Sequence, residues 1–383
     1  MSSMRSREGV ESVTMSTTLP VIAPTDRCLA DVLVSSFQSV RGVDNPLALG
    51  RVRRSVVVLV DGLGSENLAH RAAHARTLGS LRQKTVSSGF PTTTASALSS
   101  LMTGVDPGVS GMVGYAVRDP SSGEIINQLS GLDAVDVSRW QPVETVWEAN
   151  SDIPAVIVSA ARYRHSGLTR SILRGADYVS AQTYEERLAA IDGFLRLHRD
   201  GVVYVYIPEL DMTAHASGVS SQQWARRLEE LDGFIADVVR MLSKSDGLIV
   251  TADHGVIDVL PHQHIVIPEA SELTDNVLTG GEPRFLHLYV DGNVETTLNA
   301  WRSMEGSRAH IATRDDAIAA GWFGFVSEEH RERIGDVLVT PRGRHVYYDS
   351  RVATLQSMAM VGQHGGLSRA ETHVPLIFSG AYA

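Results

Sequence analysis

Cysteine is nearly absent from this sequence, because Cys28 is the only one in 383 residues. An intrachain disulfide and a zinc site built on several thiolates are therefore excluded. The chain does contain 14 histidines, and imidazole binds divalent metals without any sulfur ligand. A metal site in this protein must be built from imidazole nitrogens and carboxylate oxygens.

A long apolar run and an excess of basic residues are also missing. No apolar stretch approaches the roughly 20 residues that a membrane-spanning helix needs, so we expect no membrane insertion. The formal net charge of −10 argues against a general nucleic-acid-binding surface, which would be basic. A small phosphate-bearing ligand stays compatible with this charge if bound metal ions supply positive charge locally.

The N-terminal stretch MSSMRSREGVESVTMSTTLP is polar and lacks the apolar core of a secretory signal. We therefore expect a cytoplasmic protein. We also expect residues 1–24 to be a disordered segment, and Met15 is an alternative start of the chain.

Short apolar runs rich in β-branched residues recur along the chain, with helical patterns between them. Such runs are typical of strands buried in a parallel sheet, and they occur at Val56–Val60, Pro154–Ser159, Gly201–Ile207, Gly247–Thr251 and Val374–Ser379. Helices are predicted at Cys28–Ser39, Glu144–Asn150, Tyr184–His198 and Gln222–Ser243. This alternation predicts an α/β fold with a mostly parallel sheet.

The alternation of apolar runs and helical patterns changes between Val256 and Ala359. The patterns at Phe285–Val290, Glu295–Met304 and Val337–Thr340 predict a smaller α+β segment. We interpret residues 256–359 as an inserted cap, and residues 25–255 together with 360–383 as the core. The length and the 43% hydrophobic content suit one large domain with such an insertion.

Acids and histidines follow several of the predicted strands directly. Each has an ordinary explanation when taken alone, such as an aspartate that caps the next helix. Asp211 and His215 are four residues apart, which on a helix puts both side chains on one face. Together the set offers three carboxylates and three imidazoles, enough for two divalent ions at one edge of the sheet: Asp61, Asp211, His215, Asp253, His254 and His364.

A threonine-rich stretch, FPTTTASALSSLMTG, predicts the start of a helix. A hydroxyl group at that point lies beside unpaired backbone N–H groups and the positive end of the helix dipole, which attract phosphate oxygens. It is therefore a suitable position for a nucleophile that attacks phosphorus. The alternative is an ordinary capped structural helix.

Five motifs, in this order, resemble the nucleotide pyrophosphatase/phosphodiesterase family of the alkaline phosphatase superfamily: VLVDGLG, FPTTTASALSSLMTG, DMTAHASG, TADHG and GQHGG. The resemblance spans the chain from about Val56 to Phe378. It implies an alkaline-phosphatase-like, doubly wound sheet that carries a bimetal site.

The resemblance also implies roles for the residues of these motifs. The proline-to-nucleophile spacing of the family puts the nucleophile at Thr94, with Thr93 as the alternative. One metal ion would be held by Asp211, His215 and His364, and the other by Asp61, Asp253, His254 and the nucleophile hydroxyl. Zinc suits this ligand set best, and manganese would also be tolerated.

The sequence departs from related patterns in three places. The C/S-x-P-x-R motif of sulfatases is missing, and no arginine stands next to the nucleophile as in classical phosphomonoesterases. Many family members have an asparagine three residues after the nucleophile that binds a phosphoryl oxygen, and here that position is Ala97. Backbone N–H groups or another side chain must then bind that oxygen.

The implied function is metal-dependent hydrolysis of a nucleotide phosphodiester or pyrophosphate, a small-molecule substrate, by a monomer or homodimer. Some actinobacterial members of the family that resemble this chain in lacking a signal are cyclic di-AMP phosphodiesterases, so cyclic di-AMP is the candidate substrate. Tyr115 and Tyr163 could stack on a base, with plain aromatic packing as the alternative. The competing functions are a phosphomonoesterase, a phosphomutase, a phosphonate hydrolase, or a non-catalytic nucleotide-binding protein.

Overall fold

The computed structural model describes residues 19–23, 25 and 27–383. Most of the segment predicted to be disordered, residues 1–18 and 24, lies outside the described residues. Within them, no helix has both the length and the apolar character required for crossing a membrane.

A seven-stranded sheet forms the centre of the fold, in the order β2-β17-β8-β1-β7-β5-β6. β17 runs antiparallel to β8 and β2, and the pairs β8/β1, β1/β7, β7/β5 and β5/β6 are parallel. The α/β fold with a mostly parallel sheet is therefore confirmed. The strands are β1 (Arg54–Val60), β2 (Arg82–Ser87), β5 (Ala155–Ser159), β6 (Asp177–Ser180), β7 (Gly201–Ile207), β8 (Asp246–Thr251) and β17 (His373–Gly380).

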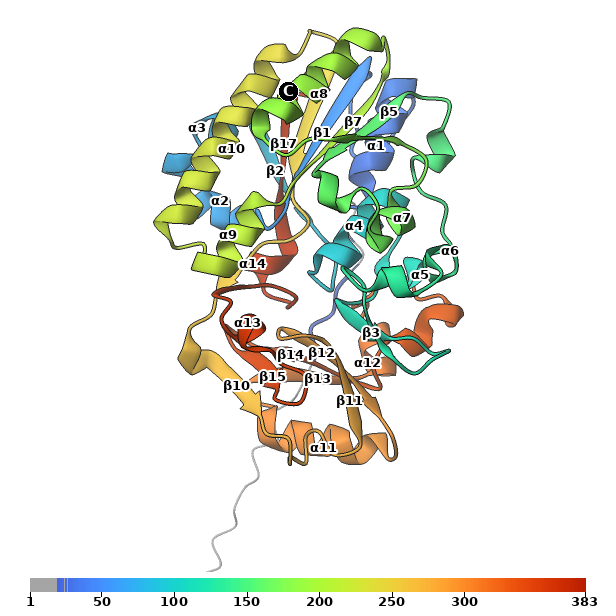
Figure 1. Cartoon of the computed structure of the whole chain (residues 1–383), viewed down its shortest axis with the longest axis vertical. Helices are drawn as coiled ribbons and strands as arrows, with labels where there is room; N and C mark the ends of the chain where they lie inside the picture. The colour runs from blue at the N-terminus through green and yellow to red at the C-terminus, as the bar shows by residue number, and fades with distance from the viewer. Residues whose placement is uncertain (1–18, 24, 26) are drawn as a thin grey trace, which may run out of the picture.

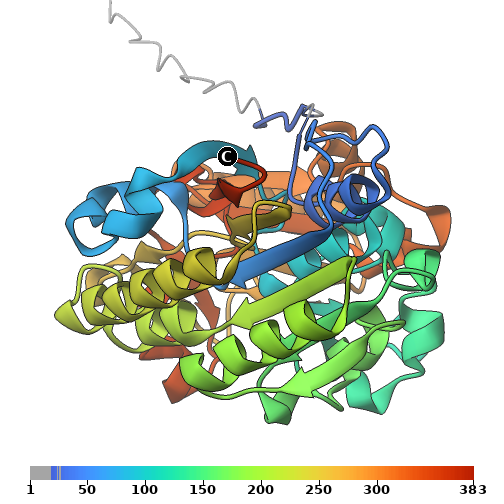
Figure 2. The same ribbon diagram turned by 90° about the horizontal axis from the view of Figure 1, so that it is seen from above.

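Helices cover both faces of this sheet, which explains why its central strands are apolar on both sides. Figures 1 and 2 show α8 (Tyr184–Leu197) and α10 (Gln222–Met241) on one face and α1 (Asp31–Arg41) on the other. Residues 56–60 of β1 are fully buried as a result.

Shorter elements surround the carboxyl-terminal edge of the sheet. A small hairpin, β3 (Ala116–Arg118) with β4 (Ile125–Asn127), joins short helices there. These helices are α2 (Ser65–His70), α4 (Thr94–Thr103), α5 (Pro107–Ser110), α6 (Val137–Trp140), α7 (Gly167–Ile172), α9 (Glu209–Ser217), α13 (Leu355–Met358) and α14 (Arg369–Thr372). The short helix α3 (Arg76–Ser80) packs against α10 instead.

The helix predicted at Glu144–Asn150 is wrong. Only a 3-10 turn at Glu148–Asn150 forms. This segment is tied to the end of α4, because the N–H of Val146 donates to the carbonyl of Met102, 2.7 Å away.

A second, antiparallel sheet lies below the first in Figure 1, in the order β11-β12-β14-β13. It has its own apolar core, which includes Leu288, Trp301 and Val339. Its strands are β11 (Val277–Glu282), β12 (Phe285–Val290), β13 (Ala309–Thr313) and β14 (Val337–Pro341), and its helices are α11 (Val294–Glu305) and α12 (Arg314–Ala319).

Two further strand pairs complete this part of the chain. β10 (His264–Ile267) pairs with β15 (Val346–Asp349), and β9 (Ile257–Asp258) pairs with β16 (Gly362–Gln363). The β9/β16 pair brings together the two ends of the segment predicted to be inserted. This arrangement supports the boundaries at residues 256 and 359, which stay a prediction.

Candidate active site

Sheet order explains why residues far apart in sequence meet at one edge. β8, β1 and β7 are neighbours, and their carboxyl ends are in register, with Leu59 opposite Thr251 and Val60 opposite Ile207. The segments that carry Asp61, Asp211 and Asp253 therefore leave the sheet side by side, and Asp211 lies in the first turn of α9. The GQHGG loop joins them because β17, which runs the opposite way, begins at this edge.

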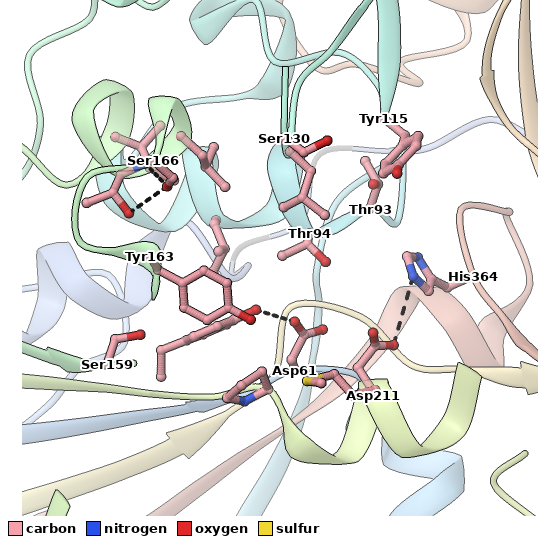
Figure 3. Close-up of a pocket in the computed structure, with 18 of the residues that line it drawn as sticks. Asp61, Thr93, Thr94, Tyr115, Ser130, Ser159, Tyr163, Ser166, Asp211 and His364 are labelled. Carbon is pink, nitrogen blue, oxygen red and sulfur yellow. Dashed lines mark hydrogen bonds and ion pairs between the residues drawn. The ribbon is translucent and has the colours of Figure 1, made fainter. Parts of the chain in front are cut away.

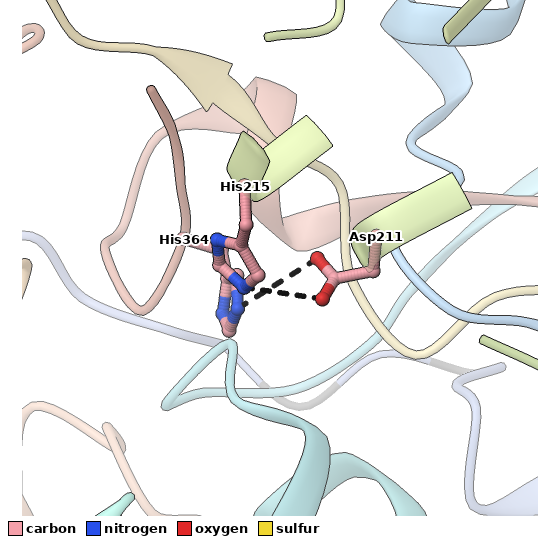
Figure 4. A group of neighbouring side chains, drawn as sticks. All are labelled: Asp211, His215 and His364. Atoms are coloured by element: carbon pink, nitrogen blue, oxygen red, sulfur yellow. Dashed lines mark ion pairs between the residues drawn. The ribbon is translucent and has the colours of Figure 1, made fainter. Parts of the chain in front are cut away.

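The first of two ligand groups contains Asp211, His215 and His364 (Figure 4). Nε2 of His215 lies 3.1 Å from one carboxylate oxygen of Asp211, and Nε2 of His364 lies 3.9 Å from the other. Both rings are oriented through Nδ1, which is 2.8 Å from the carbonyl of Gly362 in His215 and 2.9 Å from that of Thr92 in His364. These bonds leave both Nε2 atoms free to bind a cation.

The second ligand group contains Asp61, Asp211 and His254, with ligand atoms within 4.8 Å of one another. Asp253 lies beside this group, because its Oδ2 is 3.6 Å from Nε2 of His254. Its Oδ1 accepts hydrogen bonds from the N–H groups of Gly62 and His254. The structure thus brings all six predicted ligands together, and Asp211 lies between the two groups.

The electrostatics of the site fit divalent cations. Burial, and then the charges of Asp253 and Asp211, raise the pKa of Asp61 well above its usual value. Burial also raises the pKa of Asp253. For Asp211 burial acts in the same direction, but the charge and hydrogen bond of His215 together with the charges of His364 and His254 outweigh it, and the pKa falls. Three buried carboxyls so close together repel one another unless positive charge is added.

Carboxylate oxygens without a hydrogen-bond partner also indicate that the site binds cations. Among the described residues, Oδ1 of Asp61, Oδ1 of Asp211 and Oδ2 of Asp253 are buried without a hydrogen-bond partner. A buried carboxylate oxygen without a partner is costly, and a metal ion would satisfy it. The donor set of carboxylate oxygens and imidazole nitrogens fits Zn²⁺ or Mn²⁺.

The threonine-rich stretch enters the same site. Thr94 is the first residue of α4, and its hydroxyl lies 3.1 Å from Nε2 of His254. Thr93 is the extended residue before the helix. Thr92 ties this turn to the GQHGG loop, because its hydroxyl donates to the carbonyl of Gly366 and accepts from the N–H of Gly365.

Ala97 lies one turn further along α4 and is buried. It is not among the residues that line the cavity described next, whereas Thr93, Thr94 and Leu98 are. A methyl group here donates no hydrogen bond, so a phosphoryl oxygen must find its donors elsewhere.

A cavity of about 560 Å³ opens beside Thr94 (Figure 3). Tyr163, Ser159 and Ser166 lie to one side of Thr94 and Asp61 in this view, and Tyr115 and His364 lie to the other. Tyr115 and Tyr163 are both half-buried lining residues, so the structure brings them to the site, while their role as base-stacking residues stays a prediction.

Part of the lining of this cavity is mostly apolar and aromatic. We call this part the chamber. It is built from α4, the segment of α7, and strands β5, β6 and β7, and its lining residues are Leu98, Met102, Ser159, Leu168, Ile172, Leu173, Tyr178, Tyr204 and Tyr206.

Sequence reasoning missed three residues of the site. Tyr206 donates a hydrogen bond to Oδ2 of Asp61, and Tyr204 lines the chamber. Their alternation in GVVYVYI puts both on one face of β7, which is a signal that the sequence did contain. Glu282, at the end of β11, is buried 3.8 Å from Nδ1 of His364, and burial raises its pKa well above the usual value. No sequence signal pointed to Glu282.

Comparisons with known proteins agree with this geometry. A family model described as type I phosphodiesterase / nucleotide pyrophosphatase matches residues 55–367. Comparison with curated protein sequences gave no match.

Solved structures with similar folds include ectonucleotide pyrophosphatase/phosphodiesterase 5 from mouse and human. An inactive form of the murine protein in complex with AMP has a TM-score of 0.69 at 17% identity, over 86% of this chain and 88% of that one. The human protein has a TM-score of 0.68 at 17% identity, over 85% and 87%. Phosphonoacetate hydrolase from Sinorhizobium meliloti, in complex with phosphonoacetate, has a TM-score of 0.66 at 18% identity, over 86% and 91%. At this identity the similarity concerns the fold.

Proposed function

This chain belongs to the type I phosphodiesterase / nucleotide pyrophosphatase family, and from that premise we propose that it hydrolyses a nucleotide phosphodiester or pyrophosphate with Thr94 as the nucleophile. The observation that carries the proposal is the position of the Thr94 hydroxyl. It lies at the start of α4, 3.1 Å from Nε2 of His254 and beside both ligand groups. A hydroxyl at the start of a helix is well located to attack a phosphorus atom whose oxygens face the helix N–H groups.

Two divalent cations would be held by the six ligands of the site. Asp211, His215 and His364 would hold one, and Asp61, Asp253, His254 and the Thr94 hydroxyl would hold the other. When bound, they supply Lewis-acid charge that lowers the pKa of a coordinated hydroxyl and offsets negative charge in the transition state. Zn²⁺ suits the ligands best, and Mn²⁺ is the alternative.

The protein residues then carry out two displacements. The Thr94 oxygen attacks phosphorus while its proton passes to solvent, and the leaving oxygen departs on the opposite side, towards Asp211, His215 and His364. A water molecule next attacks the phospho-threonine from that side and gives up a proton to solvent. The bond between phosphorus and the Thr94 oxygen breaks, and this oxygen regains a proton, which restores the hydroxyl. The first backbone N–H groups of α4 stabilise the phosphoryl oxygens. The methyl side chain of Ala97 cannot do so, because it has no hydrogen-bond donor.

The chamber supports a nucleotide as the substrate. Its apolar and aromatic walls suit a flat group such as a base. Tyr115 and Tyr163 line other parts of the cavity, and we propose that they stack on the base. Cyclic di-AMP is the candidate substrate within this class.

We further propose that the protein works in the cytoplasm as a monomer or homodimer. The thiol of its one cysteine, Cys28, is free and only partly buried, which suits a reducing compartment. Cell fractionation and light scattering of the purified protein test these two points.

The function is tested by hydrolysis of a nucleotide panel that includes cyclic di-AMP, with the metal-reconstituted protein. Bis-p-nitrophenyl phosphate and p-nitrophenyl phosphate separate a diesterase from a monoesterase. We expect turnover of diesters by the wild type and none by Thr94→Ala. Preference for the monoester would favour a phosphomonoesterase, and metal binding without any turnover would favour a non-catalytic nucleotide-binding protein.

A further inference from the structure

Two arginines beside the cavity have no carboxylate partner. Arg162 and Arg164 follow β5 and are both exposed to solvent. Other exposed arginines, such as Arg170 and Arg196, form ion pairs with aspartates, whereas Arg162 and Arg164 form none with any described residue. The chain has a net charge of −10, so carboxylates are plentiful in it. The lack of a partner at these two positions therefore needs a local explanation.

The guanidinium group of Arg162 is held at the rim of the cavity. Its central carbon lies 4.6 Å from the centre of the Tyr163 ring, a cation–π distance. Its Nη2 donates to the hydroxyl of Tyr163, 2.9 Å away, and lies 3.5 Å from Sδ of Met212. Tyr163 and Met212 both line the cavity, so these contacts direct the charge of Arg162 towards its opening.

The charge of Arg164 lies on the same side of the cavity. Its guanidinium carbon is 5.7 Å from the ring centre of Tyr178, another lining residue. The hydroxyl of Tyr178 donates to the carbonyl of Ala160, 2.7 Å away, which fixes the ring. The N–H of Arg164 donates to the carbonyl of Ala161, 3.2 Å away, so the backbone between the two arginines is a hydrogen-bonded turn. Two unpaired positive charges thus lie against lining rings of one wall.

A path of contacts connects this wall to the metal ligands. The ring centre of Tyr163 lies 5.9 Å from that of Tyr206, and the hydroxyl of Tyr206 donates to Asp61. Two tyrosine rings therefore intervene along the path from Arg162 to Asp61. A group that binds the arginine is for this reason a different group from the one that binds at the ligands.

The side of the cavity on which this wall lies indicates which part of the substrate it meets. Figure 3 shows Tyr163 and His364 on opposite sides of Thr94. In the proposed reaction the leaving oxygen departs towards His364. The wall with Tyr163 and the two arginines therefore faces the part of the substrate that stays bonded to phosphorus.

We propose that Arg162 and Arg164 bind a second phosphate group of the substrate, carried on the sugar of the nucleotide that is transferred to Thr94. The inference rests on the proposed function, because it names the substrate class of the same site: a nucleotide diester with a further phosphate, as in a linear or cyclic dinucleotide. Guanidinium groups match phosphate oxygens in geometry and charge. The reacting phosphate occupies the metal ligands, so a second phosphate needs cations of its own.

The test compares two substrates that release the same product, p-nitrophenolate. One is thymidine 5′-(p-nitrophenyl phosphate), and the other carries an additional phosphate on its 3′ oxygen. We expect the wild type to prefer the second substrate in kcat/KM by about 10-fold, the lower end for hydrogen bonds between charged groups, because both arginines are exposed. Raising KCl should reduce this preference through screening. In Arg162→Gln/Arg164→Gln the preference should fall below about 2-fold and lose its dependence on salt.

Arg170→Gln/Arg196→Gln is the matched control, because it removes the same two units of positive charge. Both of these arginines are exposed, and they pair with Asp133 and Asp192. We expect the control to keep the wild-type preference and its salt dependence. Melting temperatures of both double variants should stay close to wild type, since exposed arginines contribute little to stability.

Four outcomes would overturn the inference: no preference in the wild type, an unchanged preference in Arg162→Gln/Arg164→Gln, an equal fall in the control, or equal losses on both substrates. If the wild type cleaves neither substrate, the proposed function fails, and binding still decides the inference. Calorimetric titration would then compare thymidine 3′,5′-bisphosphate with thymidine 5′-monophosphate. Tighter binding of the bisphosphate to the wild type, lost in Arg162→Gln/Arg164→Gln, would support the inference, and any other result would contradict it.

Discussion

The hydroxyl of Thr94 and Nε2 of His254 lie 3.1 Å apart, although the two residues are 160 positions apart in the sequence. Thr94 begins α4, and His254 follows β8, so the contact joins the helix start to the carboxyl edge of the sheet. This relationship distinguishes Thr94 from Thr92 and Thr93, whose identical side chains stand just before it.

Replacing Thr94 with alanine should abolish turnover, at least 1,000-fold, because the attacking oxygen is removed. Thr93→Ala is the matched control, since it removes a neighbouring hydroxyl that also lines the cavity, and it should keep most of the activity. Metal content and melting temperature should stay close to wild type in both. The opposite ranking of the two variants would assign the nucleophile to Thr93.

Asp61→Asn should change how the stability of the metal-free protein depends on pH. Burial and neighbouring carboxylates raise the pKa of Asp61 in the folded state. The stability from its proton is therefore complete below the unfolded pKa of about 4, and it is lost as pH rises through the raised folded pKa. Asparagine carries no such proton, so melting temperatures between about pH 4 and 8 should fall less steeply for the variant.

The control for this measurement is Asp152→Asn. Asp152 is exposed and pairs with Arg41, which lowers its pKa, so its contribution to stability is lost only as pH falls below the ordinary carboxyl range. The wild-type slope above pH 4 should be retained. Equal slopes for Asp61→Asn and the wild type would contradict the prediction, and addition of Zn²⁺ should stabilise the wild type more than Asp61→Asn.

Tyr206→Phe should weaken metal binding, because its hydroxyl donates to the Asp61 carboxylate. Loss of a group that orients a metal ligand typically costs 10- to 100-fold in metal affinity or activity, and we expect a loss in that range. Zn²⁺ competition with a chromophoric chelator measures it. Tyr382→Phe is a suitable control, since that hydroxyl binds Ser39 instead of a carboxylate of the site; equal affinity of both variants would refute the role of Tyr206.

The buried pair of Arg284 and Glu371 should be a strong determinant of stability. Both side chains are fully buried, and two bonds of 2.7 Å join them. Glu371 also accepts from the N–H of Gly366, two residues after His364, so the pair supports the loop that carries this ligand.

Glu371→Gln leaves the charge of Arg284 buried without a counterion, which should cost about 3–5 kcal/mol in urea unfolding. Glu230→Gln breaks the exposed pair with Arg227 and should cost less than about 1 kcal/mol. Similar losses of unfolding free energy for the two variants would mean that the buried pair contributes no more to stability than the exposed pair.

The strands and the ligands that follow them could be predicted from the sequence for a local reason. A strand buried on both faces needs a continuous apolar run, so β7 could be assigned at Gly201–Ile207 with the bounds that the structure has. The ligands follow such runs directly, as Asp61 follows Val60. The helix predicted at Glu144–Asn150 is only a 3-10 turn at Glu148–Asn150, in a segment that a long-range hydrogen bond from Val146 to Met102 ties to α4.

Other features were decided by the tertiary structure, because they depend on which strands become neighbours. The position of Asp211 between both ligand groups follows from β1 lying beside β7, and no local pattern contains that order. The position of Glu282 beside His364 depends on how the second sheet packs against the first. The chamber likewise arises from α4, α7 and three strands at once. The sequence by itself therefore determined the inventory of chemical groups, and long-range packing determined their distances and the shape of the space between them.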